Sequence, residues 1–312
     1  MTASGTSVFG NSNVARPVWV TGAGGFIGAH LCNALRARGE KVVAFGRHEV
    51  AGALSTQSLE AAIKAEGVPR AVHHLAGSAS VGLSLAEPLV DFERSVASAA
   101  IVLDVVRRHA PDAAVLLASS AAVYGAGHEG PIACDAPLRP FSPYGHHKRM
   151  VEQLAQSFAE SYGLRVRAVR LFSVYGEGLR KQLLFDLCGR LGQGEQDIVL
   201  GGSGREVRDW CHVDDVAEML PRLLDKAGPG FSVVNGGGGA VACVAEVAEQ
   251  VVTAWGGAQR IRFSGLSRAG DPFSLIAAPD PEEPGAPARI PLADGIGRYV
   301  RWFKATFGTV PA

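Results

Sequence analysis

Charge of one sign is what this sequence most clearly lacks. Thirty basic residues and thirty acidic residues cancel, and no block of like charge occurs along the chain. The broad electrostatic attraction that nucleic acid or an anionic membrane surface requires is therefore missing. We expect neither nucleic acid nor a membrane as a partner, and any anionic ligand must be held by local groups.

Paired cysteines and long apolar runs are missing as well. The five cysteines are scattered, which argues against a zinc site and against a disulfide framework. No uninterrupted apolar run reaches the roughly eighteen residues that a membrane-spanning helix needs. Residues 1–15 are rich in small polar side chains and lack the basic start and apolar core of a signal peptide, so we expect a flexible tail there. These absences favour a cytoplasmic protein.

Short apolar runs rich in β-branched residues alternate with longer helical patterns in the first half of the chain. The predicted strands cover residues 18–20, 42–45, 71–75, 114–118 and 166–172. Such alternation indicates a parallel sheet with crossover helices, and nearly continuous apolar strands indicate a sheet covered on both faces. The sequence therefore predicts an α/β fold with a Rossmann-like, doubly wound parallel sheet.

The second half of the chain is less regular. Helices are expected near residues 182–191, 214–224 and 295–307, separated by turn-rich and glycine-rich segments. We therefore predict a dinucleotide-binding domain over residues 16–172 and a smaller, irregular domain that is mainly substrate-binding over residues 173–312. Parts of about 206–255 are expected to pack back onto the first domain.

A glycine-rich turn, TGAGGFIG at residues 21–28, follows the first strand and leads into a helix. Glycines at these spacings permit a tight turn and a close approach of backbone N–H groups to a pyrophosphate, which the helix N-terminus also attracts. A tight turn without a ligand is the alternative. The predicted cofactor-binding residues of this turn are Gly22, Gly25, Phe26, Ile27 and Gly28.

The end of the second strand bears on which nicotinamide cofactor binds. An acidic residue at that position selects NAD, whereas a basic residue accommodates the 2′-phosphate of NADP. Gly46 and Arg47 occupy the position, and Glu49 follows too late. We predict NADP, with NAD as the alternative and with Arg47 as a cofactor-binding residue, unless Arg47 is only a solvated loop residue.

Tyr144 and Lys148 stand four residues apart at the start of a predicted helix, so both side chains share one helix face. A phenol with a pKa near 10 serves as an acid or base near neutral pH only when a neighbouring cation stabilises its phenolate. Ser119 and Ser120 end the fourth strand, at the sheet edge where such folds bind ligands. These residues predict an acid–base centre.

Six motifs in order carry a resemblance to a known family. They are TGAGGFIG, HLAG (74–77), SSAAVYG, SPYGHHK, RLFSVYGEG (170–178) and VRDWCHVDDVAE (207–218). Over about residues 17–224 the chain resembles the extended short-chain dehydrogenase/reductase family, which contains nucleotide-sugar epimerases, dehydratases and 4-keto reductases.

The resemblance implies roles residue by residue. Ser120, Tyr144 and Lys148 match the catalytic residues, and Tyr144 and Lys148 also contact the cofactor. The resemblance further implies a cofactor contact at Leu75, Ala76 and Gly77. It implies substrate contacts at Ser120, Ser173, Arg208 and Arg268. A structural ion pair of Arg208 with Asp209 or Asp214 is the alternative for that arginine.

The chain departs from the family pattern at several positions. Serines at 95 and 173 replace two asparagines, which shortens two polar side chains near the substrate. Ala121 and Ala122 replace the Asp-Glu pair of the dehydratases, which argues against dehydration. The adjacent histidine pairs 73–74 and 146–147 point apart in a strand or helix, so we expect no metal site.

Reduction of a 4-keto nucleotide sugar with NADPH is the leading hypothesis, because the cofactor loop is basic and the dehydratase pair is missing. C4 epimerisation with one tightly held NAD is the alternative. A non-catalytic NAD(P)-sensing protein is the hypothesis from another class. We also expect a homodimer, formed by the helices after Glu87 and after Tyr144.

Overall fold

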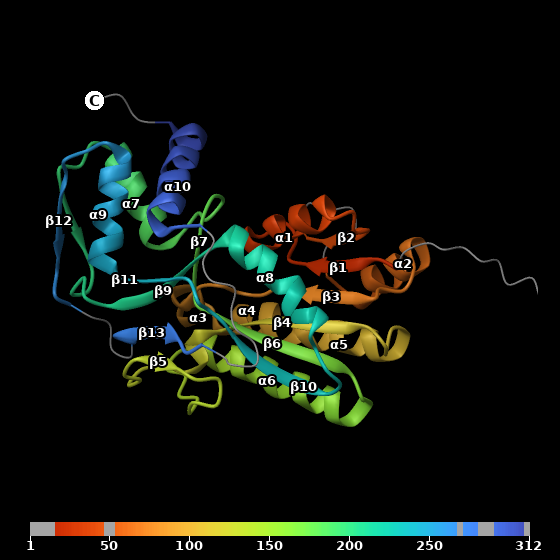
Figure 1. Cartoon of the computed structure of the whole chain (residues 1–312). Helices are drawn as coiled ribbons and strands as arrows, with labels where there is room; N and C mark the ends of the chain where they lie inside the picture. The colour runs from red at the N-terminus through yellow and green to blue at the C-terminus, as the bar shows by residue number, and fades with distance from the viewer. Residues whose placement is uncertain (1–15, 47–53, 267–270, 280–289, 309–312) are drawn as a thin grey trace, which may run out of the picture.

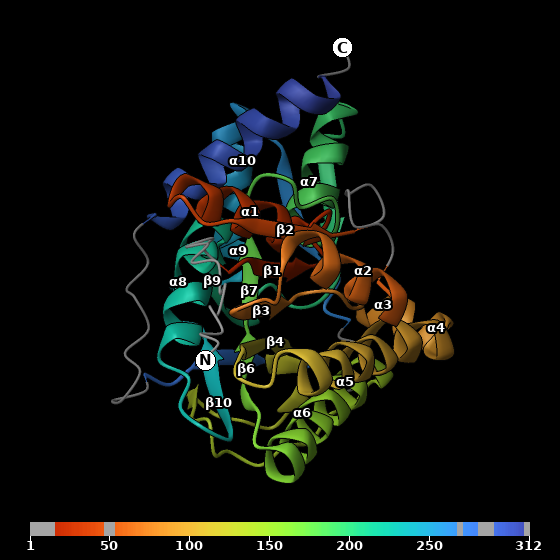
Figure 2. The same ribbon diagram turned by 90° about the vertical axis from the view of Figure 1, so that its right-hand side faces the viewer.

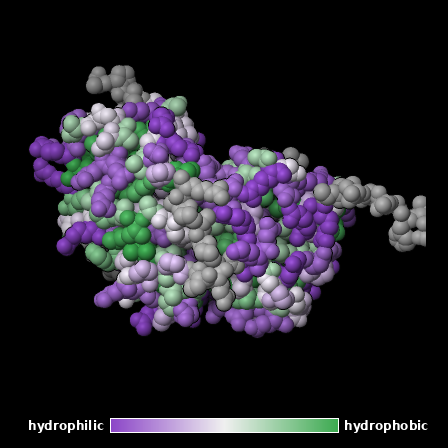
Figure 3. Space-filling view, in the orientation of Figure 1, coloured by the Kyte–Doolittle hydropathy of each residue, from purple (hydrophilic) through white to green (hydrophobic). Residues whose placement is uncertain are grey.

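The protein is described by a computed structural model that covers residues 16–46, 54–266, 271–279 and 290–308 (Figure 1). The predicted tail at residues 1–15 lies outside these ranges. Two lobes make up the molecule, and a notch separates them on one side (Figure 3).

The larger lobe is built on a six-stranded sheet, and every neighbouring pair of its strands is parallel. The strand order is β10-β6-β4-β3-β1-β2. The strands are β1 (Val18–Thr21), β2 (Val42–Phe45), β3 (Ala71–His74), β4 (Ala114–Ser120), β6 (Arg165–Leu171) and β10 (Phe231–Gly236). The first five match the predicted apolar runs, so the doubly wound parallel sheet is confirmed.

Helices cover both faces of this sheet (Figure 2). One face packs against α1 (Phe26–Ala37) and α8 (Val213–Asp225), whose leucines and valines share a core with β1 and β6. The other face packs against α2 (Thr56–Glu66), α5 (Ser98–His109) and α6 (Pro143–Tyr162). Burial on both faces explains why the strands read as nearly continuous apolar runs.

The direction of the strand order changes between β1 and β3, because the chain first adds β2 on one side and then β3 on the other. Ligands of open α/β sheets bind beyond the carboxyl ends of the strands at such a point. The glycine-rich turn follows β1, and the HLAG segment ends β3 and continues beyond it. The fold therefore brings these two predicted cofactor segments to one place.

Three short elements connect β3 to α5. They are α3 (Val81–Ala86), α4 (Pro88–Phe92) and a single π-helical turn at Glu93–Ala97. Figure 2 shows α3 and α4 beside the α5 and α6 side of the sheet, and α3 contributes a hydrogen bond to the start of α6.

The smaller lobe has its own apolar core. That core lies between α7 (Gln182–Gly192), α9 (Val244–Trp255) and α10 (Leu292–Phe307). A two-stranded sheet of β8 (Asp197–Leu200) and β12 (Arg260–Phe263) also belongs to it. Figure 3 shows apolar side chains gathered on the visible face of this lobe.

A second, mixed sheet gives this half of the chain more order than its turn-rich sequence suggests. The path is β11-β9-β13-β5, and β7 also pairs with β9. The strands are β5 (Pro131–Ile132), β7 (Ser173–Tyr175), β9 (Val207–His212), β11 (Ala240–Cys243) and β13 (Ser274–Ala277). Two later segments, α8 and β10, return to the larger lobe, where β10 forms the edge of the parallel sheet.

Candidate active site

The turn after β1 is packed too closely for any residue but glycine at two positions. Gly22 has a φ of +73°, and a Cβ there would lie 2.7 Å from the backbone of Leu75 and Ala76. A Cβ on Gly28 would lie 2.1 Å from the carbonyl oxygen of Gly22. The turn is therefore folded back onto the first turn of α1, as a phosphate-binding turn must be.

The N-terminus of α1 has no side-chain cap. Gly25 is its N-cap and supplies no side-chain hydrogen bond, whereas Ser55 caps α2 and Ser142 caps α6. The first N–H groups of a helix need a partner from outside the helix. Phe26, Ile27 and Gly28 thus offer donors at the positive end of the helix dipole, and this arrangement suits a pyrophosphate.

The segment after β3 lies directly against this turn. Thr21 Oγ1 accepts a hydrogen bond from the Ala76 backbone N at 3.3 Å and contacts His74 Nδ1 at 2.8 Å. Burial lowers the pKa of His74 to about 3, so its imidazole is neutral. The structure thus brings Leu75, Ala76 and Gly77 together with Gly22.

Tyr144, Lys148 and Ser120 meet at the carboxyl end of β4. Pro143 opens α6, and Ser142 Oγ accepts a hydrogen bond from the Gly145 backbone N at 3.3 Å, which fixes where the helix starts. Lys148 Nζ donates to the carbonyl oxygen of Ala118 at 2.8 Å and lies 5.8 Å from the centre of the Tyr144 ring. Ser120 forms a hydrogen bond with the Tyr144 side chain.

Lys148 also lies beside one of the predicted cofactor segments. A Cβ added to Gly77 would lie 3.4 Å from Lys148 Nζ. The ammonium group is therefore next to the segment that follows β3, on the side where the glycine turn lies. One lysine lies between the predicted acid–base residue and the predicted cofactor segments.

Burial has the largest effect on the pKa values of this pair. Burial raises the pKa of Tyr144 above its usual value, and the hydrogen bond from Ser120 opposes that rise. Burial lowers the pKa of Lys148 to about 8, and the negative charges of Asp91 and Glu152 oppose that fall. Tyr144 by itself is thus a proton donor at neutral pH, and it becomes a base only when further positive charge is bound beside it.

A buried ion pair behind the site was missed at the sequence level. Glu152 on α6 pairs with Arg170 on β6, with Nη2 to Oε2 at 2.8 Å, and it accepts a hydrogen bond from Ser119 Oγ at 2.5 Å. Both charged side chains are buried. The pair ties α6 to β6, and the hydrogen bond from Ser119 ties α6 to the end of β4. The arginines among the apolar residues of the run 165–171, of which Arg170 is one, were the available signal.

Two of the predicted substrate residues lie on the mixed sheet. Ser173 begins β7 and pairs in register with Trp210 on β9. Arg208, also on β9, is half-buried, and its Nη1 donates to the carbonyl oxygen of Val207 at 2.8 Å. Burial lowers the pKa of Arg208. No contact joins either residue to Tyr144 in the described part of the chain.

The alternative for Arg208 was an ion pair with Asp209 or Asp214. Both acids form their hydrogen bonds with other partners. Asp209 accepts hydrogen bonds from the backbone of Gly238 at 2.9 Å and Gly239 at 2.7 Å. Asp214 bonds His30 at 2.7 Å and Arg298 at 2.6 Å.

Two predicted residues cannot be placed. Arg47 and Arg268 lie outside the described residues. Within the described ranges, no cluster of His, Cys, Asp or Glu could hold a metal ion, and no helix is long and apolar enough to cross a membrane.

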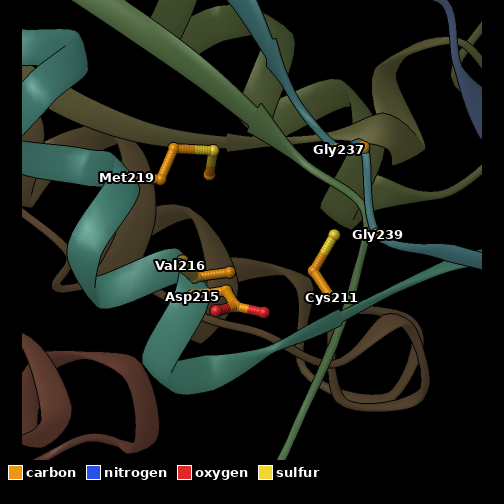
Figure 4. A pocket seen from close by; sticks show the side chains of 7 residues that line it. Cys211, Asp215, Val216, Met219, Gly237 and Gly239 are labelled. Atoms are coloured by element: carbon orange, nitrogen blue, oxygen red, sulfur yellow. The ribbon is translucent and has the colours of Figure 1, made fainter. Parts of the chain in front are cut away.

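A water-sized cavity of about 20 Å³ lies apart from these residues. Figure 4 shows Asp215 and Met219 of α8 on one side, with Cys211 of β9 and the turn of Gly237 and Gly239 on the other. None of the predicted catalytic residues lines this cavity, which has room for one water molecule.

Comparison with known proteins decides the family. Residues 18–237 match the profile of the NAD dependent epimerase/dehydratase family. The chain belongs to this family. The epimerase/dehydratase family is part of the extended short-chain dehydrogenases/reductases, so the resemblance drawn from six motifs is confirmed.

Relatives cover nearly the whole chain. UDP-glucose 4-epimerase of Azospirillum brasilense is 31% identical over 90% of this chain and 90% of its own length. The structure of MoeE5 in complex with UDP-glucuronic acid and NAD is 31% identical, with a TM-score of 0.81 over 93% of this chain and 100% of that one. The UDP-glucose 4-epimerase structure from Thermus thermophilus in complex with NAD is 26% identical, with a TM-score of 0.80, and covers 93% of this chain and 100% of that one.

Proposed function

We propose that this epimerase/dehydratase family member is a nucleotide-sugar 4-epimerase that uses a tightly held NAD. The observation that carries the proposal is the meeting of Tyr144, Ser120 and Lys148 beside the two cofactor segments. Relatives that match along nearly the full length are named 4-epimerases. Reduction of a 4-keto sugar, which the sequence favoured, has no such support from the named relatives.

NAD is the cofactor we propose, in place of the NADP expected from Gly46 and Arg47. The solved relatives named above contain NAD. The site fits a dinucleotide because the glycine turn has no room for side chains at Gly22 and Gly28 and because the first turn of α1 lacks a side-chain cap. Lys148 Nζ, whose bonded partner is a backbone carbonyl, would hold ribose hydroxyl groups.

The proposed chemistry divides between cofactor and protein. A bound nicotinamide supplies reversible hydride uptake at the sugar carbon. Tyr144 would take the proton of the sugar hydroxyl while hydride leaves the same carbon for the cofactor. After the ketone turns, hydride would return to the opposite face of that carbon, and Tyr144 would return the proton to its oxygen. Ser120 would hold the same oxygen, since its hydroxyl already bonds Tyr144. Ala121 and Ala122 provide no acid or base for elimination, which separates this chain from the dehydratases.

We further propose that the larger lobe is the cofactor half and the smaller lobe mainly the substrate half. Ser173 and Arg208 would face the nucleotide sugar from the mixed sheet, and Arg208 and Arg268 would hold its phosphates. A guanidinium suits that role because it can bond two phosphate oxygens at once.

The reaction is tested by incubating purified protein with UDP-glucose or UDP-glucuronate, with and without added NAD, NADP, NADH or NADPH. We expect the 4-epimer to form without net change in nicotinamide absorbance, and we expect denatured protein to release NAD. Consumption of NADPH by a 4-keto sugar would replace the epimerase by the reductase. Bound cofactor without any turnover would favour the sensing protein.

We propose a homodimer formed through α3, α4 and α6. Four large apolar side chains on these helices are exposed, namely Leu85, Leu89, Phe92 and Met150. Helices with such a face commonly bury it against a second helix pair.

Leu89→Asp is expected to convert the dimer to a monomer, because a charge would be buried in the apolar interface. Light scattering after size exclusion measures the mass. Leu266→Asp is the matched control, since Leu266 is also exposed but lies in the sequence after β12. A monomeric wild-type protein at micromolar concentration would contradict the proposal.

A further inference from the structure

Asp91 is a buried acid without a complete set of hydrogen bonds. Its side chain on α4 is 0% exposed. Oδ2 pairs with His147 Nδ1 at 2.5 Å, whereas Oδ1 is buried and has no hydrogen-bond partner among the described residues. A carboxylate oxygen left unpaired in the interior lowers the stability of the fold. Such a group calls for a role that outweighs this cost.

The pair adjoins Lys148 on α6. His147 precedes Lys148 on α6, and its ring packs edge-on against Phe92 with 5.6 Å between ring centres. The short helix α3, which precedes α4, contacts Tyr144 as well. Ser84 Oγ on α3 accepts a hydrogen bond from the Tyr144 backbone N at 3.0 Å. The segment from Tyr144 to Lys148 is thus held at both ends from α3 and α4.

The charges around Lys148 come from several elements. Asp91 from α4 and Glu152 from α6 act on it as negative charges, and Lys181 from the loop before α7 acts as a positive one. Glu152 is already neutralised by Arg170 at 2.8 Å. His74 of β3 also faces Lys148 and is neutral, because its pKa is about 3. Of the two acids that act on Lys148, Asp91 is therefore the one that is not paired with an arginine.

We propose that Asp91, held in place by His147, is a positioning residue that keeps the Lys148 side chain charged beside Tyr144. The role rests on the proposed function, since it matters for catalysis only if Lys148 and Tyr144 are the reacting pair. The unpaired Oδ1 leaves part of the negative charge of Asp91 without a hydrogen-bond donor in the same interior as the ammonium group.

The sign of the effect follows from the charges. Burial lowers the pKa of Lys148 to about 8, and Asp91 opposes that fall. Removing the Asp91 charge therefore lowers the pKa of Lys148 further, and the lysine loses its proton at a lower pH. The pKa of Tyr144 moves the same way, because Asp91 raises it. Both limbs of a pH–activity profile are expected to move toward acid.

The decisive variant is Asp91→Asn, which keeps the volume and removes the charge. Purified full-length protein is labelled with 13C at the lysine ε carbons, and the Lys148 resonance is assigned by its absence in Lys148→Arg. We expect the titration midpoint of Lys148 to fall by about 1 pH unit in Asp91→Asn. Glu93→Gln is the matched control, because Glu93 stands two residues further along the same segment but is exposed.

Two variants of His147 test the pair from its other side. His147→Leu removes the group that holds the Asp91 carboxylate, and the Lys148 midpoint is expected to fall as in Asp91→Asn. His147→Asn places an amide donor where Nδ1 was, and the midpoint is expected to stay at the wild-type value. These two variants decide the question if Asp91→Asn does not fold.

A Lys148 midpoint that is unchanged in both Asp91→Asn and His147→Leu overturns the proposal, because a purely structural pair would alter stability without moving the midpoint. The titration requires no substrate. Failure of the epimerase assay therefore leaves this result interpretable, and failure of the titration leaves the epimerase assay standing.

Discussion

Replacing Tyr144 by Phe is expected to lower turnover about 10³-fold while leaving cofactor binding unchanged, since positioned acid–base groups contribute about 10²- to 10⁴-fold. The substitution removes one oxygen and keeps the ring that lies 5.8 Å from Lys148 Nζ. Ser120 alone cannot replace the lost group, because an aliphatic hydroxyl is a far weaker acid than a phenol. The rate of 4-epimer formation, followed by NMR, measures the effect.

Tyr162→Phe is the matched control for this experiment. Tyr162 ends the same helix, α6, and its side chain is exposed. We expect wild-type turnover from it. Retention of more than a tenth of the activity in Tyr144→Phe would mean that another residue moves the proton.

The second large effect is expected at the glycine turn. Gly28→Ala is expected to weaken NAD binding at least 100-fold, because the new Cβ would lie 2.1 Å from the carbonyl oxygen of Gly22. That neighbour is backbone and cannot rotate away, so the turn must open and its N–H groups must leave the positions that a pyrophosphate requires. Calorimetric titration of cofactor-free protein with NAD measures the affinity.

The same turn offers a control at Gly24. A Cβ there would meet nothing within 4 Å, and Gly24 is not among the glycines with positive φ. Gly24→Ala is therefore expected to bind NAD about as well as the wild type. Equal affinities of the two alanine variants would show that the cofactor does not depend on this turn.

The sheet of the larger lobe was largely predictable because its signal is local. Runs such as Val18–Thr21 and Val42–Phe45 are apolar along their length, and the structure buries them on both faces. The glycine turn was equally predictable, because its spacing directly encodes the close approach of Gly22 and Gly28. The start of α6 at Pro143 put Tyr144 and Lys148 on one helix face, as their spacing predicts.

Features that depend on distant pairing could not be predicted in this way. The strand β10 pairs with β6, whose partner residues come 65 positions earlier in the chain, and nothing in the sequence of β10 identifies that partner. Asp91 and His147 are 56 residues apart, and Glu152 and Arg170 come from a helix and a strand. Each of these residues by itself reads as an ordinary polar residue. Charge pairs of this kind become visible only when the fold has brought their elements together.

The return of α8 and β10 to the larger lobe has a consequence for how the protein unfolds. A fragment that ends at residue 172 would lack the edge strand beside β6 and the helix that covers Leu31 and Leu35 of α1. The chain therefore passes from the larger lobe to the smaller lobe and back before it ends. Neither half is a continuous stretch of sequence, so the two are expected to lose their structure in one cooperative transition.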